Sequence, residues 1–439
     1  MTSEWPIVTL QEVCETITDG AHASPKDYPG GLPMASVKDM ARWGIDVKTS
    51  RTIAPNDFED LVRNGCQPQI GDILIAKDGA TCLDTVCEFK QPDKIVLLSS
   101  VAILRPSDRL HSSYLRYYLD SADTRAMLKA GYVSGSAIPR VVLKDFRRAP
   151  IPLPPLSEQK AIASILGALD DKIELNRRMN ATLEGMARAL FQSWFVDFDP
   201  IRAKLDGRKP EGMDKATAAL FPDAFQESPI GPVPKGWTIR ALADVIDVKH
   251  GFAFEGKYFS DERCGDILLT PGNFAIGGGF KDAKVKYYIG PVSEDYILCD
   301  HDLVLTMTDL SKAADTLGYP AMIPPPPMGY RYLHNQRIGK VHITQSNAAT
   351  PLFLYRLFCS EAYRHEILAG ATGTTVKHTS PTRIRAFKSL FPSAGVLEVF
   401  EKQLNIWYLL ATQNESQSRT LATLRDTLLP KLLSGELSQ

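Results

Sequence analysis

Residues 157–190 of this 439-residue chain read SEQKAIASILGALDDKIELNRRMNATLEGMARAL, and one set of positions in them is strictly spaced. From Ile162 to Leu190, each member of the set lies alternately four and three residues after the one before. The set comprises Ile162, Leu166, Leu169, Ile173, Asn176, Asn180, Leu183, Ala187 and Leu190. Such a 4-3 repeat is typical of a helix that pairs with another helix along one seam. The asparagines make the middle of this seam polar.

A looser version of the pattern runs from Phe400 to Leu428. Its positions are Phe400, Leu404, Trp407, Ala411, Asn414, Ser418, Leu421, Arg425 and Leu428. The alternative is two unrelated amphipathic helices, each packed on its own core. Because both seams are polar in the middle and fall at matching places in a repeat, we predict that the two helices pair with each other, antiparallel, as a coiled coil.

The repeat extends over the whole chain, which reads as a globular part followed by a helix, twice. The aligned stretches are Trp5 with Trp237, 71–78 with 301–308, and 182–195 with 420–433. In both halves a helical stretch also runs into a glycine and then into a loop of small residues, at 131–139 and at 370–378. Glycine is a common stop signal for a helix.

The globular parts contain short β-like runs bounded by Gly, Pro and Asp, with a few helices between them and no regular strand–helix alternation. This pattern predicts an α+β fold rather than a doubly wound sheet. We expect two globular domains separated by two long antiparallel helices, with pseudo-two-fold symmetry. The expected segments are a first globular domain (1–150), a central helical spacer (151–200), a linker (201–233), a second globular domain (234–392) and a C-terminal helical spacer (393–439).

The expected length of this seam is comparable to one helical turn of B-DNA. From Ile162 to Leu190 a helix measures roughly 42 Å at ~1.5 Å per residue. B-DNA presents the same groove again after about 34–36 Å. Two different domains carried on such helices would be suited to read two different half-sites on one face of a duplex.

Composition permits nucleic-acid binding without indicating it. The formal net charge of −1 argues against a polybasic DNA binder. Residues 1–150 hold 18 Lys and Arg against 19 Asp and Glu, whereas residues 234–390 hold 18 against 15, a difference of +3. The seven cysteines show no C-x-x-C spacing, and neither a signal peptide nor a membrane-spanning run is apparent. We therefore expect a cytoplasmic protein without membrane attachment.

Several motifs, taken together and in order, resemble one known family. Residues 151–160 read IPLPPLSEQK, 192–200 read QSWFVDFDP, 230–237 read IGPVPKGW and 424–437 read LRDTLLPKLLSGEL. The first two stretches look like the central region of type I restriction-modification specificity (S) subunits, the third resembles the entry to their second target-recognition domain, and the fourth resembles their C-terminal signature. Residues 71–79 and 334–339 look like motifs that recur inside the target-recognition domains of that family. The similarity covers the whole chain in its organisation.

The resemblance implies a non-catalytic subunit that reads a bipartite, asymmetric sequence in double-stranded DNA. It also implies helices that dock two methyltransferase (M) subunits, with motor-nuclease (R) subunits joining for cleavage. S-adenosylmethionine, ATP and Mg²⁺ would belong to those partners, and this chain would hold no cofactor and no metal. The alternative is a specificity subunit of another restriction class that serves a fused methyltransferase-nuclease. No G-x-x-x-x-G-K-[ST] phosphate loop is present, so we expect that this chain does not itself hydrolyse ATP.

Contact residues are predicted only by residue type, and for each the alternative is an ordinary surface role. Hydroxyl and basic side chains suited to phosphate are Ser134, Ser136, Arg140, Thr374, Thr375, Lys377 and His378. Side chains suited to base edges are Lys77, Asp78, Thr308, Asn335, Gln336 and Arg337. His334 and His342 flank an expected strand, and without a third ligand nearby they favour a core or surface role over metal binding.

Overall fold

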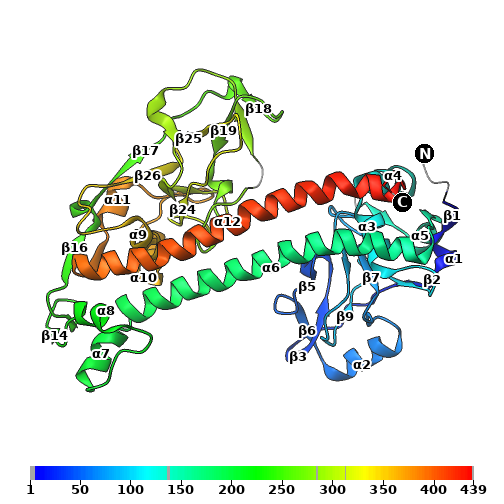
Figure 1. Ribbon diagram of the computed structural model, residues 1–439, viewed down its shortest axis with the longest axis horizontal. Coiled ribbons are helices and arrows are strands. Elements are labelled where there is room, and N and C mark those ends of the chain that lie inside the picture. The colour runs from blue at the N-terminus through cyan, green and yellow to red at the C-terminus, as the bar shows by residue number, and fades with distance from the viewer. Residues whose placement is uncertain (1–4, 136–138, 283–284, 312, 438–439) are drawn as a thin grey trace. The chain divides into compact units, whose positions relative to one another are not determined.

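The structure, a computed structural model, describes residues 5–135, 139–282, 285–311 and 313–437. It divides into two compact units (Figure 1). The first unit contains Met1–Arg178 and Asn414–Gln439, and the second contains Met179–Gln413. The first unit therefore combines the two ends of the chain. Among the described residues, no helix is long and apolar enough to cross a membrane.

Each unit contains a four-stranded antiparallel sheet, and the strand order is the same in both. In the first unit the order is β2 (Cys14–Asp19), β10 (Val101–Pro106), β7 (Ile73–Ala76) and β8 (Val86–Glu88). In the second it is β17 (Ile246–His250), β26 (Ile338–Ile343), β22 (Leu303–Thr306) and β24 (Pro320–Met322). The internal repeat read from the sequence is thus present in the topology.

A second sheet in each unit contains one parallel strand pair at the equivalent place. The first unit has the order β6 (Arg51–Ile53), β3 (Asp27–Ala35), β9 (Val96–Leu97), with β3 and β9 parallel. The second has β18 (Phe259–Ser260), β20 (Lys286–Tyr288), β19 (Asp266–Leu269), β25 (Tyr332–His334), β21 (Ile297–Leu298), with β19 and β25 parallel. Mixed sheets with helices packed beside them agree with the expected α+β class.

Short two-stranded pairs complete both units. The first unit holds β1 (Ile7–Thr9) with β13 (Pro150–Pro152), β4 (Met40–Ala41) with β5 (Gly44–Ile45), and β11 (Val133–Ser134) with β12 (Arg140–Val141). The second holds β14 (Phe225–Gln226) with β15 (Val233–Pro234), β16 (Thr238–Ala241) with β28 (Lys388–Phe391), and β23 (Thr308–Asp309) with β27 (Lys377–His378).

Some of the shorter helices recur between the units. Those of the first are α1 (Leu10–Val13), α2 (Pro55–Arg63), α3 (Ser112–Asp120), α4 (Ala122–Tyr132) and α5 (Leu143–Arg148). Those of the second are α7 (Asp199–Leu205), α8 (Lys215–Leu220), α9 (Pro351–Phe358), α10 (Glu361–Ala369) and α11 (Pro381–Ala386). The α3–α4 pair and the α9–α10 pair each precede a loop of small residues, as the sequence predicts.

Two 40-residue helices, α6 (Leu156–Phe195) and α12 (Ala394–Leu433), run through both units and pair antiparallel. In the first unit, Ile162 and Leu166 of α6 share a hydrophobic core with Leu429 and Leu432 of α12. In the second, the other half of each helix contributes to a core rich in aromatic rings, in which the centroid of Phe195 lies 4.8 Å from that of Phe400. The predicted antiparallel pairing is confirmed.

The seam positions are all buried or partly buried. Ile162, Leu166, Asn176, Leu404 and Asn414 are buried, whereas Leu169, Ile173, Leu183, Leu190, Trp407, Leu421 and Leu428 are partly buried. In its polar middle, the Asn176 side-chain amide donates to the Asn414 carbonyl (3.3 Å) and to Gln417 Oε1 (2.9 Å). Hydrogen bonds of this kind favour one register of the helices over its neighbours.

Candidate nucleic-acid interface

The first unit gathers several predicted contact residues where strands of its four-stranded sheet end. The backbone N–H of Lys77 donates to the Ser100 carbonyl, and the Lys77 carbonyl accepts from Val141 N–H, both at 2.9 Å. Beside it, Asp78 pairs with Arg140 of the β11–β12 hairpin, whose other strand carries Ser134. We call this region the first strand-end surface and define it as Asp19–Ala21, Lys77–Gly79, Ser99–Ser100, Val133–Ser134 and Arg140–Val141. Ser136 lies outside the described residues.

The amine of Lys77 does not point freely into solvent from this surface. Its side chain is buried, and Nζ lies 3.3 Å from an Asp19 carboxylate oxygen and 3.1 Å from one of Asp78. A buried ammonium needs such compensation, because leaving it unpaired is costly. In this arrangement Lys77 ties the ends of β2 and β7 together, while Arg140 and Ser134 are exposed.

The second unit has the equivalent surface, with different side chains. Met307 N–H donates to the Arg337 carbonyl (2.9 Å), and Thr379 N–H donates to the Met307 carbonyl (3.0 Å). The Thr308 hydroxyl lies 3.1 Å from Nδ1 of His378, its partner across the β23–β27 pair. We call this region the second strand-end surface and define it as His250–Phe252, Met307–Asp309, Asn335–Arg337 and Thr372–Thr379.

Within the second surface, the predicted contact residues differ in accessibility. Thr308 and Asn335 are buried, and the Asn335 side-chain oxygen accepts from Arg337 N–H at 3.0 Å. The side chains that reach solvent are those of Gln336, Arg337, Thr374, Thr375 and His378, with Lys377 partly exposed.

Two residues that the sequence analysis did not single out belong to this surface. Phe252 is 44% exposed, and its backbone pairs with that of Asn335. His250 Nδ1 lies 3.4 Å from the Gln336 carbonyl oxygen. The internal repeat contains a signal that could have identified both residues. Gly20 and Gly251 occupy equivalent positions, each directly after the first edge strand of its sheet, and His250 and Phe252 flank Gly251. A Cβ on Gly20 would lie 2.1 Å from the Leu97 carbonyl oxygen, and one on Gly251 would lie 2.2 Å from that of Asn335. Only glycine allows these backbones to approach so closely.

His334 has a structural place in the core. Its ring is fully buried, with Nε2 2.9 Å from the Ile338 carbonyl oxygen. Burial lowers the pKa of His334 to about 4, so the ring is neutral at physiological pH. Among the described residues, no group of three or more His, Cys, Asp or Glu side chains is placed to hold a metal ion.

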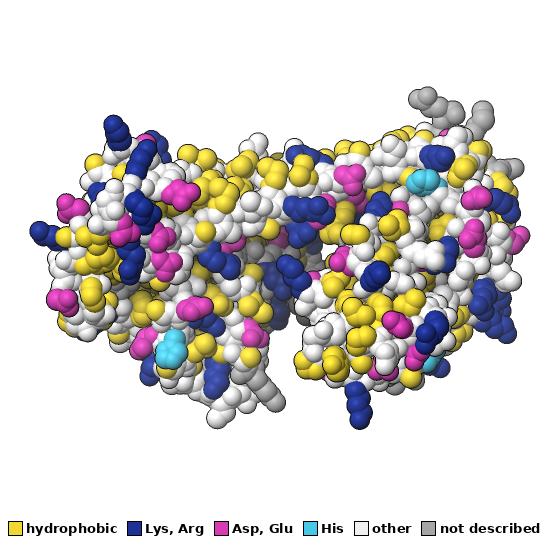
Figure 2. Space-filling view, turned by 90° about the horizontal axis from the view of Figure 1, so that it is seen from below, with side chains coloured by type: hydrophobic (Ala, Val, Ile, Leu, Met, Phe, Trp, Pro, Cys, Tyr) yellow, Lys and Arg dark blue, Asp and Glu magenta, His cyan; other side chains and the backbone are white. Residues whose placement is uncertain are grey.

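Charge on the face drawn in Figure 2 is mixed, with Lys and Arg side chains interspersed among acidic and apolar ones. The long helices, in contrast, carry exposed apolar side chains away from their seam. On α6 these are Ile165, Leu175 and Met186, and on α12 they are Ile406, Leu409, Leu410 and Leu424. Of these, Ile406, Leu409 and Leu410 lie within about one helical turn, close enough to form an apolar patch of the kind that marks a binding surface for another protein.

Comparison with known proteins agrees with this organisation. A family model described as "Type I restriction modification DNA specificity domain" matches residues 2–185. The MjaIX specificity subunit of Methanocaldococcus jannaschii is 24% identical over 99% of this chain and 94% of its own length. The HindI specificity subunit of Haemophilus influenzae is 25% identical over 79% of this chain and 82% of its own length.

The fold is also that of a solved S subunit. The crystal structure of the type I restriction-modification S subunit from M. genitalium superposes with a TM-score of 0.55, at 14% identity, over 98% of this chain and 96% of the other. The repeated sheet topology and the antiparallel helices agree with these similarities: residues 2–185 match the type I restriction-modification DNA specificity domain, and the chain as a whole is similar to specificity subunits of those systems.

Proposed function

We propose that this chain reads a bipartite, asymmetric DNA sequence and directs partner subunits to methylate or cleave DNA accordingly. The observation that carries the proposal is one sheet topology present twice, with the same strand ends bearing different side chains. Lys77 and Asp78 in the first unit correspond to Met307 and Thr308 in the second. Equivalent backbones with different side chains are suited to read unlike half-sites.

Individual contacts follow from which side chains are exposed. The Gln336 amide matches the edge of adenine, the Arg337 guanidinium matches guanine, and an exposed ring such as Phe252 suits a thymine methyl group. The hydroxyls of Thr374 and Thr375 are suited to the phosphate backbone, as are Ser134 and Arg140 in the first unit. We propose Phe252 and His250 as additions to the contact residues expected from sequence.

The remaining activities belong to partners in this proposal. The exposed apolar side chains of α6 and α12 would dock two M subunits, and R subunits would join for cleavage. S-adenosylmethionine, ATP and Mg²⁺ would be bound by those subunits, in the cytoplasm where the host DNA lies. Purified chain incubated with labelled S-adenosylmethionine and duplex DNA should incorporate no methyl groups, and stoichiometric incorporation would falsify this part of the proposal.

A domain exchange tests the reading function itself. Residues 1–150 are replaced by the equivalent block of a relative, the chain is expressed with its own M subunits, and the methylome of the cells is sequenced. We expect one half-site to change and the other to stay as it was. A methylome in which both half-sites change, or neither, contradicts the two-reader proposal.

A restriction system with a fused methyltransferase-nuclease is not favoured, because the similar curated proteins are named as type I specificity subunits. Genes for separate M and R subunits beside this gene would agree with the type I assignment. A single fused gene there would support the other class.

A further inference from the structure

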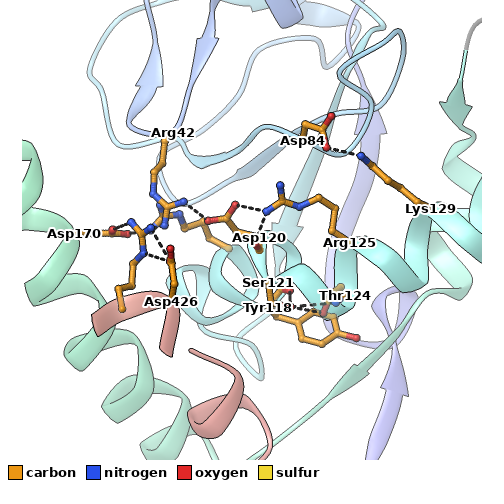
Figure 3. A network of polar contacts seen from close by, with 12 residues as sticks. Arg42, Asp84, Tyr118, Asp120, Ser121, Thr124, Arg125, Lys129, Asp170 and Asp426 are labelled. Atoms are coloured by element: carbon orange, nitrogen blue, oxygen red, sulfur yellow. Dashed lines mark hydrogen bonds and ion pairs between the residues drawn. The ribbon is translucent and has the colours of Figure 1, made fainter. Parts of the chain in front are cut away.

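The carboxylate of Asp170, on α6, is the centre of a buried polar network in the first unit (Figure 3). Asp170 is 2% exposed and accepts hydrogen bonds from donors on three other elements. Arg116 Nη1 (2.5 Å) and the Tyr117 hydroxyl (2.9 Å) come from α3, and Arg425 Nη1 (2.8 Å) comes from α12. Arg42, in the turn between β4 and β5, contributes a longer contact of 3.4 Å. One side chain thus joins the globular part of the unit to both long helices.

The network continues on either side of Asp170. Arg42 also bonds Asp120 at the end of α3 (2.5 Å), and Arg125 of α4 bonds the same carboxylate (3.3 Å). On the helix side, Arg425 pairs with Asp426 at 2.7 Å. The chain of contacts therefore runs from α12 through α6 to the turn after β4 and on to α4.

Charged hydrogen bonds restrict orientation in a way that apolar contacts do not. The hydrophobic effect is non-directional. Packing of Ile162 and Leu166 with Leu429 in one core therefore allows small rotations of the globular part against the helices at little cost in free energy. Guanidinium–carboxylate bonds require particular distances and angles. Burial by itself raises the pKa of Asp170, but the arginines around it, Arg116 foremost, lower that pKa to about 2. The carboxylate is consequently ionised, and the network intact, at physiological pH.

The second unit is attached to the helices in a different manner. In the repeat, Asp170 aligns with Tyr408 and Arg425 aligns with Ala187. Many of the contacts there are aromatic. Among the described residues, Arg356 of α9 pairs with Glu184 of α6 at 2.6 Å, and Glu401 of α12 accepts from the Leu352 N–H of α9 at 3.1 Å, so each carboxylate serves one long helix. Within the described residues, a carboxylate shared by both long helices and the globular part is thus particular to the first unit.

We propose that Asp170 is a positioning residue that fixes the angle of the first recognition domain on the helix pair. By doing so it restricts the spacer length between half-sites that the complex accepts. This inference rests on the proposed function. Each added base pair turns the far half-site by about 34–36° around the DNA axis. If the first recognition domain is held at one angle, the complex can bind both half-sites only when the spacer has one length. If the domain can rotate slightly, it can still bind its half-site when the spacer is one base pair longer or shorter.

The test uses the full chain assembled with its own M subunits and DNA duplexes carrying the methylome-defined half-sites. The duplexes have the native spacer, one base pair more, or one base pair fewer. Arg425→Met keeps Asp170 paired with Arg116 and Tyr117 but removes the bond to α12, and Asp170→Asn weakens every bond. We expect the preference for the native spacer to fall about tenfold in both variants, a change of about 1.4 kcal/mol. The same base sequence within each half-site should still be preferred.

Glu174→Gln is the matched control. Glu174 lies one helical turn after Asp170 and is 9% exposed, and it also bonds two arginines, but these are Arg177 and Arg178 of its own helix. Its variant should keep the wild-type spacer preference. If Asp170→Asn fails to assemble, Arg425→Met decides the question.

An assembled Arg425→Met complex that weakens binding equally on all three duplexes would mean that the network only supports the fold, which overturns the inference. Unchanged spacer preference would overturn it as well. If the wild-type complex methylates no bipartite site at all, it is the proposed function that fails, so the two failures are distinguishable.

Discussion

At the residue scale, the two units carry different side chains at equivalent positions of a shared sheet topology. The buried amine of Lys77 lies between two carboxylates, whereas the equivalent residue, Met307, is an uncharged side chain with its sulfur in the core. Ala21 is buried, whereas Phe252, at the equivalent position, is exposed. A shared backbone with changed side chains would allow one fold to read the two unlike half-sites that we propose, without a change in topology.

Phe252→Ala should alter recognition of the second half-site at one base pair. Loss of the ring removes an apolar contact and should reduce discrimination there by roughly 1 kcal/mol, or about fivefold. The measurement is binding of the assembled complex to duplexes substituted at each half-site position. Phe259→Ala is the control, because Phe259 is 39% exposed on β18, at the far edge of the five-stranded sheet from β25. Equal effects of the two substitutions would contradict a direct role for Phe252.

The burial of His334 predicts how the stability of the second unit depends on pH. The pKa of this histidine is about 4 in the folded protein because of burial, and about 6.5 when the chain is unfolded. Between these values the unfolded chain binds the proton that the folded chain excludes, so stability falls as pH drops from about 6.5 to 4. The loss is roughly 3 kcal/mol in the free energy of unfolding.

His334→Gln should flatten this dependence, because glutamine does not titrate and can still donate toward the Ile338 carbonyl. Urea unfolding of both proteins at pH 7.5 and 4.5, followed by tryptophan fluorescence, measures it. Parallel losses of stability in wild type and variant would show that other groups dominate.

At the scale of elements, the long helices could be predicted from sequence because their information is local. The 4-3 spacing lies within one stretch, and the matching polar middles around Asn176 and Asn414 indicated the partner. The strand order could not be predicted, since it depends on pairs such as β7 with β10 that are far apart in the chain. The burial of Lys77 could not be predicted for the same reason, because the Asp19 carboxylate that compensates its charge lies in another strand.

Leu166→Asp tests the seam as an element. Leu166 is fully buried between the helices and the first recognition domain. An uncompensated carboxylate there should cost about 3–5 kcal/mol of stability. The neighbouring Ile165 is exposed, so Ile165→Asp should change stability by no more than about 0.5 kcal/mol. Thermal unfolding of the purified chains compares them, and equal melting temperatures would mean that the seam is not buried as described.

Leu183→Asp extends the test to the second unit. Leu183 is a partly buried seam residue, so solvent reaches part of the new charge. Leu183→Asp should therefore lower the free energy of unfolding by less than Leu166→Asp does. Both seam variants should also lose assembly with M subunits, without any change in the strand-end surfaces. Normal assembly in both would contradict the importance of the seam.

At the scale of the whole molecule, each long helix carries residues of both units, and the end of the chain returns to the unit that contains its beginning. The last half of α12 supplies Leu429 and Leu432 to the core of the first unit. A chain that ended before Asn414 would leave the start of α6 without its partner. Both long helices therefore contribute to both recognition domains. They are the candidate elements for setting the distance between the two half-sites, in the manner of a ruler.

Inserting one heptad in each long helix, near Asn176 and Asn414, should lengthen that ruler while leaving every seam residue on its face. The added length is about 10 Å, at most about three base pairs at ~3.4 Å each. Because each base pair also turns the far half-site by about 34–36°, twist in the helices or the DNA must absorb the mismatch. We expect unchanged half-sites separated by one to three additional base pairs, with weaker binding, as read by methylome sequencing. Two-residue insertions at the same places turn the seam positions that follow by about 200° around each helix, which takes them off the seam face, and should abolish assembly. An active heptad variant that keeps its original spacer would show that another part of the complex sets the distance.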